Sequence, residues 1–430
     1  MPSAPDSGSV AVVGAGIIGL SIALRLQRDG TKVTVIDPRE PMSGCSAGNA
    51  GYLSESNIFP PAAWSVLRRI PSMLFSRSGP LVVRPSYVPQ FIPWVMQALR
   101  SSAAEAAAHV NRSMASLLGQ AIAAFDGLID AASARHLIER RGGLIAYRTT
   151  GALAVKAQLL PRWNALGIRA EEVTAHTVRD LEPALAPMAG GILFPNAGRC
   201  LDPRALGLLY FQRFVQDGGT FLQERVTQLE PGSDQVCARL SDGHEVRASR
   251  LVACTGFESG PLQALLPFRL PLASERGYHL MLPSPGIQLG RTVVFGEPLF
   301  GATSMQEGLR LAGTAEFAHA DSPSAMERAH MLLPLARDFL PRLNGSDAVP
   351  WMGVRPSLPD GMPAIGALAS TPRILYAVGH SHNGLTTSAI TAQCIAAVVA
   401  GRRPPIDLSP FAIERFSRRS ISAAPTSSSA

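Results

Sequence analysis

The sequence predicts an α/β protein with two interleaved domains, one built on a parallel sheet and the other on a mixed sheet. Its 430 residues are roughly three times the commonest domain size, so two domains are expected. A strand, a glycine-rich turn, a helix and a second strand open the chain, which is how a parallel-sheet domain begins. Buried strands of the same kind return in the middle and near the end, so we expect that domain to be assembled from separate segments.

The composition predicts a large buried core. The chain is 46% hydrophobic and 17% charged, whereas an average globular protein is about 25% charged, so a disordered or fibrous protein is excluded. The net charge of +7 comes from basic residues spread along the whole chain, so no nucleic-acid partner is expected. The cysteines show neither metal-binding nor redox spacing, which predicts no metal site and buried thiols in a reducing compartment.

No run of about 18 apolar residues stands out, so we expect no transmembrane helix. The first strand begins near Ser9, which leaves no room before it for a signal peptide. We therefore expect a cytoplasmic protein, and peripheral contact with the inner face of the cell membrane stays open.

The first forty residues contain a complete βαβ dinucleotide-binding fingerprint. It comprises the strand Ser9–Val13, the turn Gly14-Ala15-Gly16-Ile17-Ile18-Gly19, the helix Leu20–Leu26, the strand Lys32–Ile36 and Asp37. Gly14 makes the tight turn, Gly16 lets the backbone approach a pyrophosphate, and Gly19 lets the helix pack on the strand. Asp37 is placed to accept hydrogen bonds from the adenosine ribose, and its charge would repel a 2′-phosphate.

The rest of the chain alternates between the two domains. An alanine-rich stretch predicts one long helix over residues 101–138. The first domain is expected to comprise 1–142 (with an apolar, proline-rich insertion at 56–104), 201–268 and 351–416; the second comprises 143–200 and 269–350, and 417–430 is a disordered tail.

Further motifs follow in order along residues 9–416. They are Ser46-Ala47-Gly48-Asn49-Ala50-Gly51, Leu181–Leu185, Ala253-Cys254-Thr255-Gly256, Gly353-Val354-Arg355-Pro356, residues 359–366 and residues 379–386. Together with the fingerprint they resemble the FAD-dependent amine and amino-acid oxidoreductases related to D-amino acid oxidase and glycine oxidase. The segment 79–85, with Pro93 and Trp94, resembles the bacterial D-amino acid dehydrogenases of the small-subunit type most closely.

This resemblance implies a Rossmann-like FAD-binding domain interleaved with a mixed-sheet substrate domain. Val226 would lie against the adenine, and the start of the last helix would favour negative charge at the pyrimidine end of the flavin. The residues expected to contact FAD are Gly14, Ala15, Gly16, Ile17, Ile18, Gly19, Asp37, Pro38, Arg39, Ser46, Ala47, Gly48, Asn49, Ala50, Val226, Cys254, Thr255, Gly256, Arg355, Gly379, His380, Asn383, Gly384, Leu385 and Thr386.

The resemblance also implies the substrate site. Arg355 matches the family's carboxylate-binding arginine, and the planar guanidinium suits a bidentate contact with a carboxylate. A structural ion pair is the alternative role for Arg355. Tyr278 and Tyr52 are candidates to cover the substrate or donate to its carboxylate, and a half-buried tyrosine in a sheet is the alternative for each.

The implied reaction is oxidative deamination of a D-amino acid by hydride transfer to the flavin, with the electrons passed to a quinone or another respiratory acceptor. The pattern His380-Ser381-His382-Asn383 makes D-proline and D-hydroxyproline candidate substrates. An oxidase that reduces oxygen to peroxide is one alternative, and a flavin-binding protein without turnover is the other.

The insertion 56–104 predicts a segment that lies on a membrane, where a quinone is dissolved. It contains no Asp or Glu, and it combines basic with apolar side chains, as interfacial segments do. These residues are Arg68, Arg69, Arg77, Arg84 and Arg100, with Trp64, Leu67, Met73, Leu74, Phe75, Phe91, Trp94, Val95 and Met96. A lid over the second domain or a dimer contact is the alternative.

Overall fold

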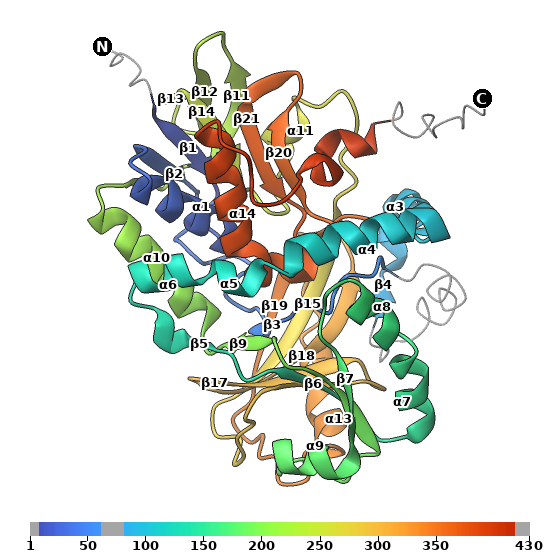
Figure 1. Ribbon diagram of the computed structural model, residues 1–430. Helices are drawn as coiled ribbons and strands as arrows, with labels where there is room; N and C mark the ends of the chain where they lie inside the picture. The colour runs from blue at the N-terminus through green and yellow to red at the C-terminus, as the bar shows by residue number, and fades with distance from the viewer. Residues whose placement is uncertain (1–7, 62–80, 418–430) are drawn as a thin grey trace, which may run out of the picture.

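The computed structural model describes residues 8–61 and 81–417. Figure 1 shows two halves, an upper one around a parallel sheet and a lower one around a large mixed sheet. Both termini emerge beside the upper half. The expected fold class is confirmed.

The parallel sheet has the strand order β10-β2-β1-β14-β21-β20. Its strands are β1 (Val10–Val13), β2 (Val33–Ile36), β10 (Thr220–Leu222), β14 (Arg250–Ala253), β20 (Ala364–Leu368) and β21 (Thr371–Val378). Only β20 runs antiparallel to its neighbour. The apolar strand β1 is buried along its whole length, as expected for a strand covered on both faces.

The two faces of this sheet have different covers. Val10 and Val12 share a core with three helices, whereas Ala11 and Val13 share a core with a small antiparallel sheet. The helices are α1 (Ile17–Arg28), α10 (Pro203–Gln216) and α14 (Gly384–Val399), and the small sheet comprises β11 (Val226–Pro231), β12 (Val236–Leu240) and β13 (Glu245–Ala248). Alternation along β1 therefore ties both layers to one strand.

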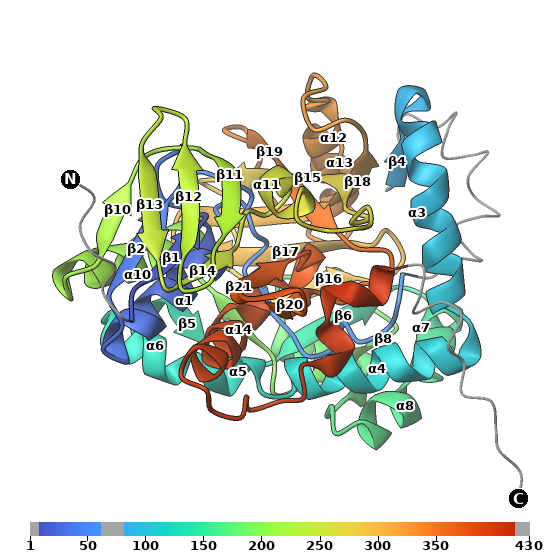
Figure 2. The ribbon, with the colours of Figure 1, turned by 90° about the horizontal axis from the view of Figure 1, so that it is seen from above.

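The mixed sheet has the order β19-β15-β18-β17-β16-β6-β8-β7, with β4 paired to β18. Its strands are β4 (Leu81–Val83), β6 (Gly143–Tyr147), β7 (Glu171–Thr174), β8 (Gly190–Phe194), β15 (Ala273–Leu282), β16 (Thr292–Phe295), β17 (Phe300–Met305), β18 (Gly308–Phe317) and β19 (Val349–Ser357). One face packs on α12 (Glu327–His330) and α13 (Leu332–Arg337). The other face is turned toward the parallel-sheet domain (Figures 1 and 2).

A short sheet and several helices connect the two domains. The short sheet is β3 (Tyr52–Leu53), β9 (Gly198–Cys200) and β5 (Ile138–Glu139), in the order β3-β9-β5. The remaining α-helices are α3 (Val88–Ser101), α4 (Ala104–Leu118), α5 (Ala121–Ala124), α6 (Asp126–Ala131), α7 (Thr150–Ala157), α8 (Leu160–Ala165), α9 (Ala175–Leu181) and α11 (Gly260–Gln263).

Two details differ from the sequence expectation. The boundary expected at residue 351 falls inside β19, which belongs to the mixed sheet rather than to the parallel one. The single helix expected over 101–138 is divided into α4, α5 and α6, with turns near Gly119 and Phe125. Glycine in a helix interior weakens the helix, so a turn at Gly119 costs little.

By length and hydropathy alone, one helical stretch of the described residues could cross a membrane, although no such run was expected. It is Ala104–Ala131, with a mean hydropathy of 1.2 in its most apolar window. Within the protein 61% of that window is buried, and α4 and α5 both contact α14. A core helix has the same composition, so this observation is weak evidence for a membrane span.

The apolar insertion is partly a structural element of the second domain. Phe91, Trp94 and Val95 of α3 are buried in one core with Phe317 of β18, and the Trp94 indole N–H donates to the Ser357 carbonyl oxygen at 3.0 Å. These three side chains therefore do not face a membrane, which corrects the sequence interpretation for them. Figure 2 shows α3 beside β4 at the edge of the molecule.

Other residues of the insertion have different outcomes. The Arg84 guanidinium lies 2.7 Å from a carboxylate oxygen of buried Glu316, so it serves an internal ion pair. Met96 and Arg100 are exposed on α3. Trp64, Leu67, Arg68, Arg69, Met73, Leu74, Phe75 and Arg77 lie outside the described residues, as does the expected tail beyond Ser417.

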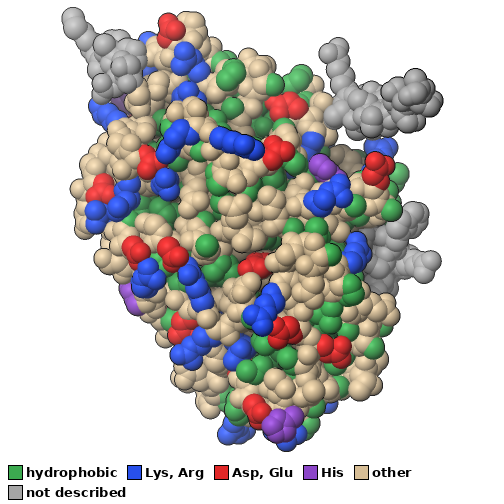
Figure 3. Space-filling model, in the orientation of Figure 1, with side chains coloured by type: hydrophobic (Ala, Val, Ile, Leu, Met, Phe, Trp, Pro, Cys, Tyr) green, Lys and Arg blue, Asp and Glu red, His purple; other side chains and the backbone are tan. Residues whose placement is uncertain are grey.

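The charged side chains on the face seen in Figure 3 are interspersed. Basic and acidic groups lie beside one another over both domains on this face. Ion pairs at the protein surface include Arg140 with Asp126 at 2.6 Å and Arg169 with Glu171 at 2.6 Å. This face therefore offers no continuous basic surface to a nucleic acid.

Candidate active site

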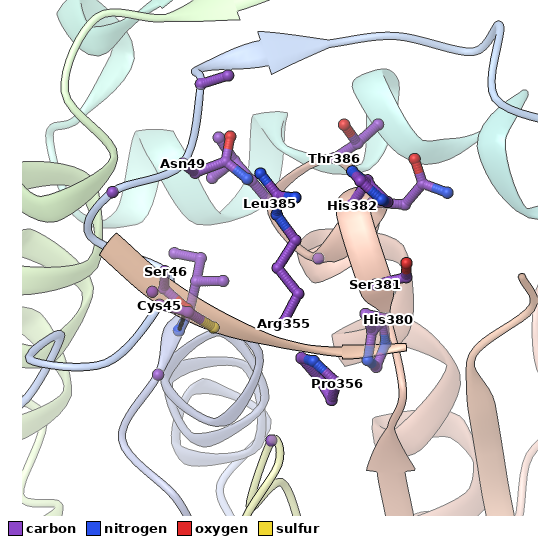
Figure 4. Close-up of a pocket in the computed structure, with 18 of the residues that line it drawn as sticks. Cys45, Ser46, Asn49, Arg355, Pro356, His380, Ser381, His382, Leu385 and Thr386 are labelled. Atoms are coloured by element: carbon purple, nitrogen blue, oxygen red, sulfur yellow. Dashed lines mark hydrogen bonds between the residues drawn. The ribbon is translucent and has the colours of Figure 1, made fainter. Parts of the chain in front are cut away.

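A cavity of about 890 Å³ lies between the two domains. Four chain segments meet there: the turn after β1, the loop that follows Asp37, strand β19 and the start of α14. Figure 4 shows Arg355 rising from its strand between Asn49 on one side and His382 and Thr386 on the other. The cavity therefore collects motifs that are far apart in the sequence.

The turn after β1 has the geometry that its glycines predict. Gly14 has a φ of +112°, and a Cβ there would lie 2.4 Å from the Cys254 carbonyl oxygen. A Cβ on Gly19 would lie 1.8 Å from the Gly14 carbonyl oxygen, so only glycine allows this approach of helix to strand. At Gly16 a Cβ would meet only the Ser46 hydroxyl, at 3.3 Å, which leaves its cavity side open to a phosphate.

Asp37 closes the far end of this turn. Its carboxylate accepts hydrogen bonds from the backbone N–H of Ala15 at 2.8 Å and of Arg39 at 2.9 Å. The Arg39 guanidinium in turn lies 3.1 Å from the Glu258 carboxylate. Two acidic side chains therefore flank the place where the fingerprint positions an adenosine ribose, and both disfavour a phosphate on that ribose.

Side chains of the mixed sheet contact the backbone of the loop of small residues after Cys45. The buried Arg310 guanidinium donates to the carbonyl oxygen of Asn49 at 2.5 Å and of Ala47 at 3.3 Å. The Nδ1 of His279 lies 3.0 Å from the Gly48 carbonyl oxygen. A Cβ on Gly48 would lie 2.1 Å from the Trp351 ring, so this close packing requires glycine.

His279 and Arg310 were not among the predicted site residues. Burial and the charge of Arg310 lower the pKa of His279 to about 3, so His279 is neutral and donates through Nδ1. Its ring stacks on Trp351 with a centroid distance of 4.8 Å. His279 directly follows Tyr278 in the strand pattern Arg276-Gly277-Tyr278-His279. Neighbouring side chains on a strand point to opposite faces, so the pattern indicates that only one of these two residues can face the cavity.

Tyr278 lies on the opposite face of β15 from the cavity. It is 1% exposed, and its hydroxyl hydrogen-bonds to Glu316 at 2.5 Å and accepts from the Ala325 N–H. The structure therefore places Tyr278 in the core behind the sheet and not over a substrate. The sequence-based prediction of Tyr278 as a substrate residue is therefore wrong, and the adjacent His279 lies on the side of β15 that faces the cavity loop.

Arg355 lies at the cavity and is held by a buried carboxylate. Its guanidinium donates to the Glu275 Oε1 at 3.0 Å, and the same oxygen lies 2.8 Å from the Nε2 of His382. The Ser357 hydroxyl donates to the other oxygen of Glu275 at 2.6 Å. The guanidinium lies flat over Gly277, where a Cβ would come within 2.3 Å of it.

Glu275 was not predicted either, and nothing in its local sequence marks it. Burial by itself would raise the pKa of its carboxyl, but the charges of His382 and Arg355 and the hydrogen bonds from His382 and Ser357 hold that pKa well below its usual range. The carboxylate therefore stays charged at neutral pH and fixes the direction of Arg355.

We expect Glu275→Gln to lower the free energy of unfolding by about 1–3 kcal/mol at neutral pH, because buried partners lose a charged acceptor. The folded pKa lies below the unfolded value of about 4.3, so the carboxylate stabilises the protein fully above that pH and loses this effect as the pH falls through the folded pKa. The difference from wild type, measured by urea unfolding, should therefore shrink in acid.

Glu171, whose side chain is 42% exposed and pairs with Arg169, supplies the control. Glu171→Gln should change the free energy of unfolding by less than about 0.5 kcal/mol. A loss for Glu275→Gln that is equally large at every pH would contradict a role for its charge.

Tyr52 lines the cavity with its ring but turns its hydroxyl into the protein. The hydroxyl is buried without a hydrogen-bond partner among residues 8–61 and 81–417, and it packs where a Cβ on Gly143 would lie. Burial raises the pKa of Tyr52 to about 12. The phenol is therefore protonated at neutral pH and points away from the cavity.

We expect Tyr52→Phe to leave kcat/KM within about threefold of wild type and to keep or raise the melting temperature. Removing a buried hydroxyl that lacks a partner is neutral or stabilising. Steady-state kinetics and thermal unfolding measure the two effects. A drop of 100-fold in kcat would show instead that the hydroxyl takes part in the reaction.

The loop before α14 completes the cavity. Gly379 has a φ of +75°, and the next residue, His380, is buried with its Nε2 3.3 Å from the Thr391 hydroxyl. Burial lowers the pKa of His380 to about 3, so its ring is neutral. The side chain of Asn383 accepts a hydrogen bond from Asn57 and does not cap α14. The first N–H groups of this helix therefore remain available to a ligand.

Most of the residues predicted to contact FAD line this cavity. Those that do not are Gly19, Pro38, Ala47 and Val226, and Tyr278 is the one predicted substrate residue outside it. Ala47 supports the cavity indirectly, because its carbonyl oxygen binds Arg310. Gly19 does so by letting α1 approach the turn at Gly14. In the described part of the chain, no group of three or more His, Cys, Asp or Glu side chains is arranged to hold a metal.

These features fit an FAD molecule. The glycine turn leaves room for the diphosphate, the acidic pair accepts the ribose, and the open start of α14 provides donors for the polar end of a flavin. Small residues at Gly48, Asn49 and Ala50 leave the space between the two ends free for a flat ring.

Comparisons with known proteins agree with this fit. The sequence model of the family described as FAD dependent oxidoreductase matches residues 9–398. A D-amino-acid oxidase of Bradyrhizobium diazoefficiens is 32% identical over 420 residues, covering 96% of this chain and 100% of the relative. A D-amino acid dehydrogenase of Chromohalobacter salexigens is 28% identical over 425 residues, covering 95% and 99%.

A solved structure has the same fold. Glycine oxidase from Geobacillus kaustophilus superposes with a TM-score of 0.73 at 21% sequence identity, covering 95% of this chain and 99% of that one. The motifs, the cavity and these matches lead to one conclusion: the chain belongs to the FAD dependent oxidoreductase family that includes the D-amino acid oxidases and dehydrogenases.

Proposed function

We propose that the protein oxidises a D-amino acid to its imine, which water then hydrolyses to a 2-oxo acid and ammonia. The observation that carries this proposal is the position of Arg355, a guanidinium at the cavity wall between the loop of small residues and the start of α14. A fixed guanidinium matches the two oxygens of an α-carboxylate.

The chain's own residues orient the substrate. FAD, when bound, supplies the two-electron oxidation by accepting a hydride from the α-carbon. Arg355 binds the carboxylate and thereby aims the α-carbon at the cavity interior. Glu275 keeps the guanidinium in place from the neighbouring strand, and Arg310 and His279 hold the loop on which the flavin would rest.

Two groups of the cavity wall, His380 and Tyr52, do not accept a proton at neutral pH. Burial lowers the pKa of His380 to about 3, so its ring binds a proton only weakly. The pKa of His279, which contacts the loop of small residues, is also lowered to about 3. Tyr52 keeps its proton because its pKa is raised to about 12. His382 also lines the cavity, with its Nε2 2.8 Å from Oε1 of Glu275. We expect the substrate to bind with a neutral amine, so the pH dependence of kcat/KM should follow the amine of the substrate used.

We further propose a quinone as the electron acceptor and the inner face of the cell membrane as the place of reaction. The similarity to D-amino acid dehydrogenases supports this choice. Ile92 and Met96, one turn apart on α3 and both at least half exposed, are the described apolar side chains of the insertion that remain available for lipid. The 32% identity to a D-amino-acid oxidase favours oxygen as the second candidate acceptor.

Turnover with two acceptors tests the proposal. Purified holoprotein is supplied with a panel of D- and L-amino acids, D-proline and D-hydroxyproline among them, together with either a soluble quinone or oxygen. We expect 2-oxo acid or cyclic imine only from D-amino acids, faster with quinone and without peroxide. Peroxide in proportion to product would make the protein an oxidase, and no product from any amino acid would leave a flavin-binding protein without turnover.

A further inference from the structure

The cavity continues beyond Arg355 across the face of the mixed sheet as far as α7 and α8. The wall at this far end is apolar and aromatic, formed by Phe59, Ile145, Tyr147 and Trp163. Lys156 of α7 also lines this end of the cavity. Arg162 of α8 lies over the Phe59 ring at 5.1 Å but is not among the lining residues. The far end thus differs in character from the polar end at the fingerprint.

Lys156 has no anionic partner in residues 8–61 and 81–417. Its ammonium lies 5.3 Å from the centroid of the Trp163 ring, and no ion pair involves it. The remaining stretches of sequence contain a single acidic residue, Asp6. Burial lowers the pKa of Lys156, and no neighbouring charge offsets this effect. A half-buried ammonium beside aromatic rings is costly unless an anion accompanies it.

Glu297 is already engaged by other hydrogen-bond donors. Glu297, on the turn after β16, accepts hydrogen bonds from the backbone N–H groups of Arg148 and Thr149 at 2.8 and 3.1 Å. Neither Glu297 nor any other carboxylate of the described residues raises the pKa of Lys156. An anion for Lys156 therefore has to come from a molecule in the cavity.

The floor between the two cations is made of small residues. The guanidinium of Arg355 lies over Gly277 of β15, and the next strands present Ala312, Gly313 and Gly301 to the cavity. Strand β6, which carries Tyr147, is four strands from β15, a separation of roughly 19 Å at about 4.8 Å per strand. A substrate with a short side chain, held at Arg355, would leave this space to water.

We propose that the substrate carries a second carboxylate, which binds Lys156 while the α-carboxylate binds Arg355. The substrate class is an amino acid whose long side chain or nitrogen substituent ends in a carboxylate, since short chains cannot span the roughly 19 Å between β15 and β6. This inference rests on the proposed function for the role of Arg355. The aromatic wall contacts the methylene chain and lowers the local dielectric constant, which strengthens the ion pair at its end.

A matched substrate series tests the proposal on the holoprotein. D-2-Aminosuberate, D-2-aminosebacate and D-2-aminododecanedioate are each paired with the analogue in which a methyl group replaces the terminal carboxylate, and D-glutamate, which is too short to reach Lys156 from Arg355, is the length control. N-Carboxyalkyl glycines of similar length form a third arm, which distinguishes a side chain from a nitrogen substituent as the source of the second carboxylate. Both kcat/KM and the dissociation constant from the flavin absorbance change are measured.

Lys156→Met removes the charge and keeps an apolar chain, with Lys156→Gln as a second variant if the first fails to fold. Lys32, the other lysine of the chain, lies exposed at the start of β2, so Lys32→Met is the matched control. We expect wild type and Lys32→Met to prefer the dicarboxylates by about 10- to 100-fold, as hydrogen bonds to charged groups do. Lys156→Met should lose this preference and keep its kcat/KM for the methyl analogues.

Two results separate failure of the inference from failure of the function. If wild type uses the methyl analogues as well as the dicarboxylates, or if Lys156→Met keeps the preference, the inference is wrong while the proposed function stands. If no amino acid reduces the flavin, the proposed function is wrong, and the binding titrations of wild type and Lys156→Met still decide whether Lys156 binds a carboxylate.

Discussion

Arg355→Ala should lower kcat/KM for D-amino acids by about 30- to 5,000-fold, mainly through a higher KM. Losing one partner of a buried charged pair costs about 2–5 kcal/mol in binding, which converts to that range. Arg355→Lys should recover little of the loss, because an ammonium cannot make the bidentate contact. Steady-state kinetics with each variant, at matched FAD content, measures the effect.

A substrate without the carboxylate is the control for this prediction. The amide of the same D-amino acid should be a poor substrate of wild type and should be affected little by Arg355→Ala, because it lacks the anion that Arg355 recognises. If the acid and the amide lose activity equally, Arg355 supports the fold through Glu275 and does not recognise substrate.

Gly19→Ala should abolish FAD binding or folding. A Cβ at this position would lie 1.8 Å from the carbonyl oxygen of Gly14, and a backbone atom cannot move aside as a flexible side chain can. Overpacking of this kind costs about 1–3 kcal/mol and sometimes more. Helix α1 would have to leave the turn that it covers, so the flavin content of the purified protein and its melting temperature should both fall.

Gly127→Ala is the matched control, because nothing lies within 4 Å of a Cβ at that position in α6. It should keep full flavin content and raise the free energy of unfolding by about 0.5–1 kcal/mol, the gain of alanine over glycine in a helix. A Gly19→Ala protein with normal flavin content would contradict the close packing between α1 and the turn.

The parts of the fold that could be predicted are those in which local sequence decides the backbone. Gly14 has a positive φ, and Gly19 lies against the Gly14 carbonyl oxygen, so the spacing of these glycines predicts the turn, although the contact of Gly14 with Cys254 comes from a distant strand. The returning strands were recognisable because strands buried on both faces are continuously apolar, as β1 and residues 251–253 of β14 are.

The parts that sequence could not predict depend on contacts across the sheet. Glu275 and Arg355 are distant in sequence and meet because β15 and β19 are neighbours. Tyr278 and His279 are adjacent and point to opposite faces, so the choice between them needs the face of the strand. Trp94 reads as a membrane residue from composition, but it fills a core with Phe317.

Anaerobic reduction of the flavin tests whether the protein oxidises D-amino acids. Purified holoprotein is mixed with a D-amino acid or its L-enantiomer without oxygen, and the absorbance of the oxidised flavin is followed. We predict that the D-enantiomer bleaches the flavin within the turnover time, that the L-enantiomer does not, and that Arg355→Ala bleaches far more slowly. Bound FAD that no D-amino acid reduces, or protein that contains no FAD, would contradict the account.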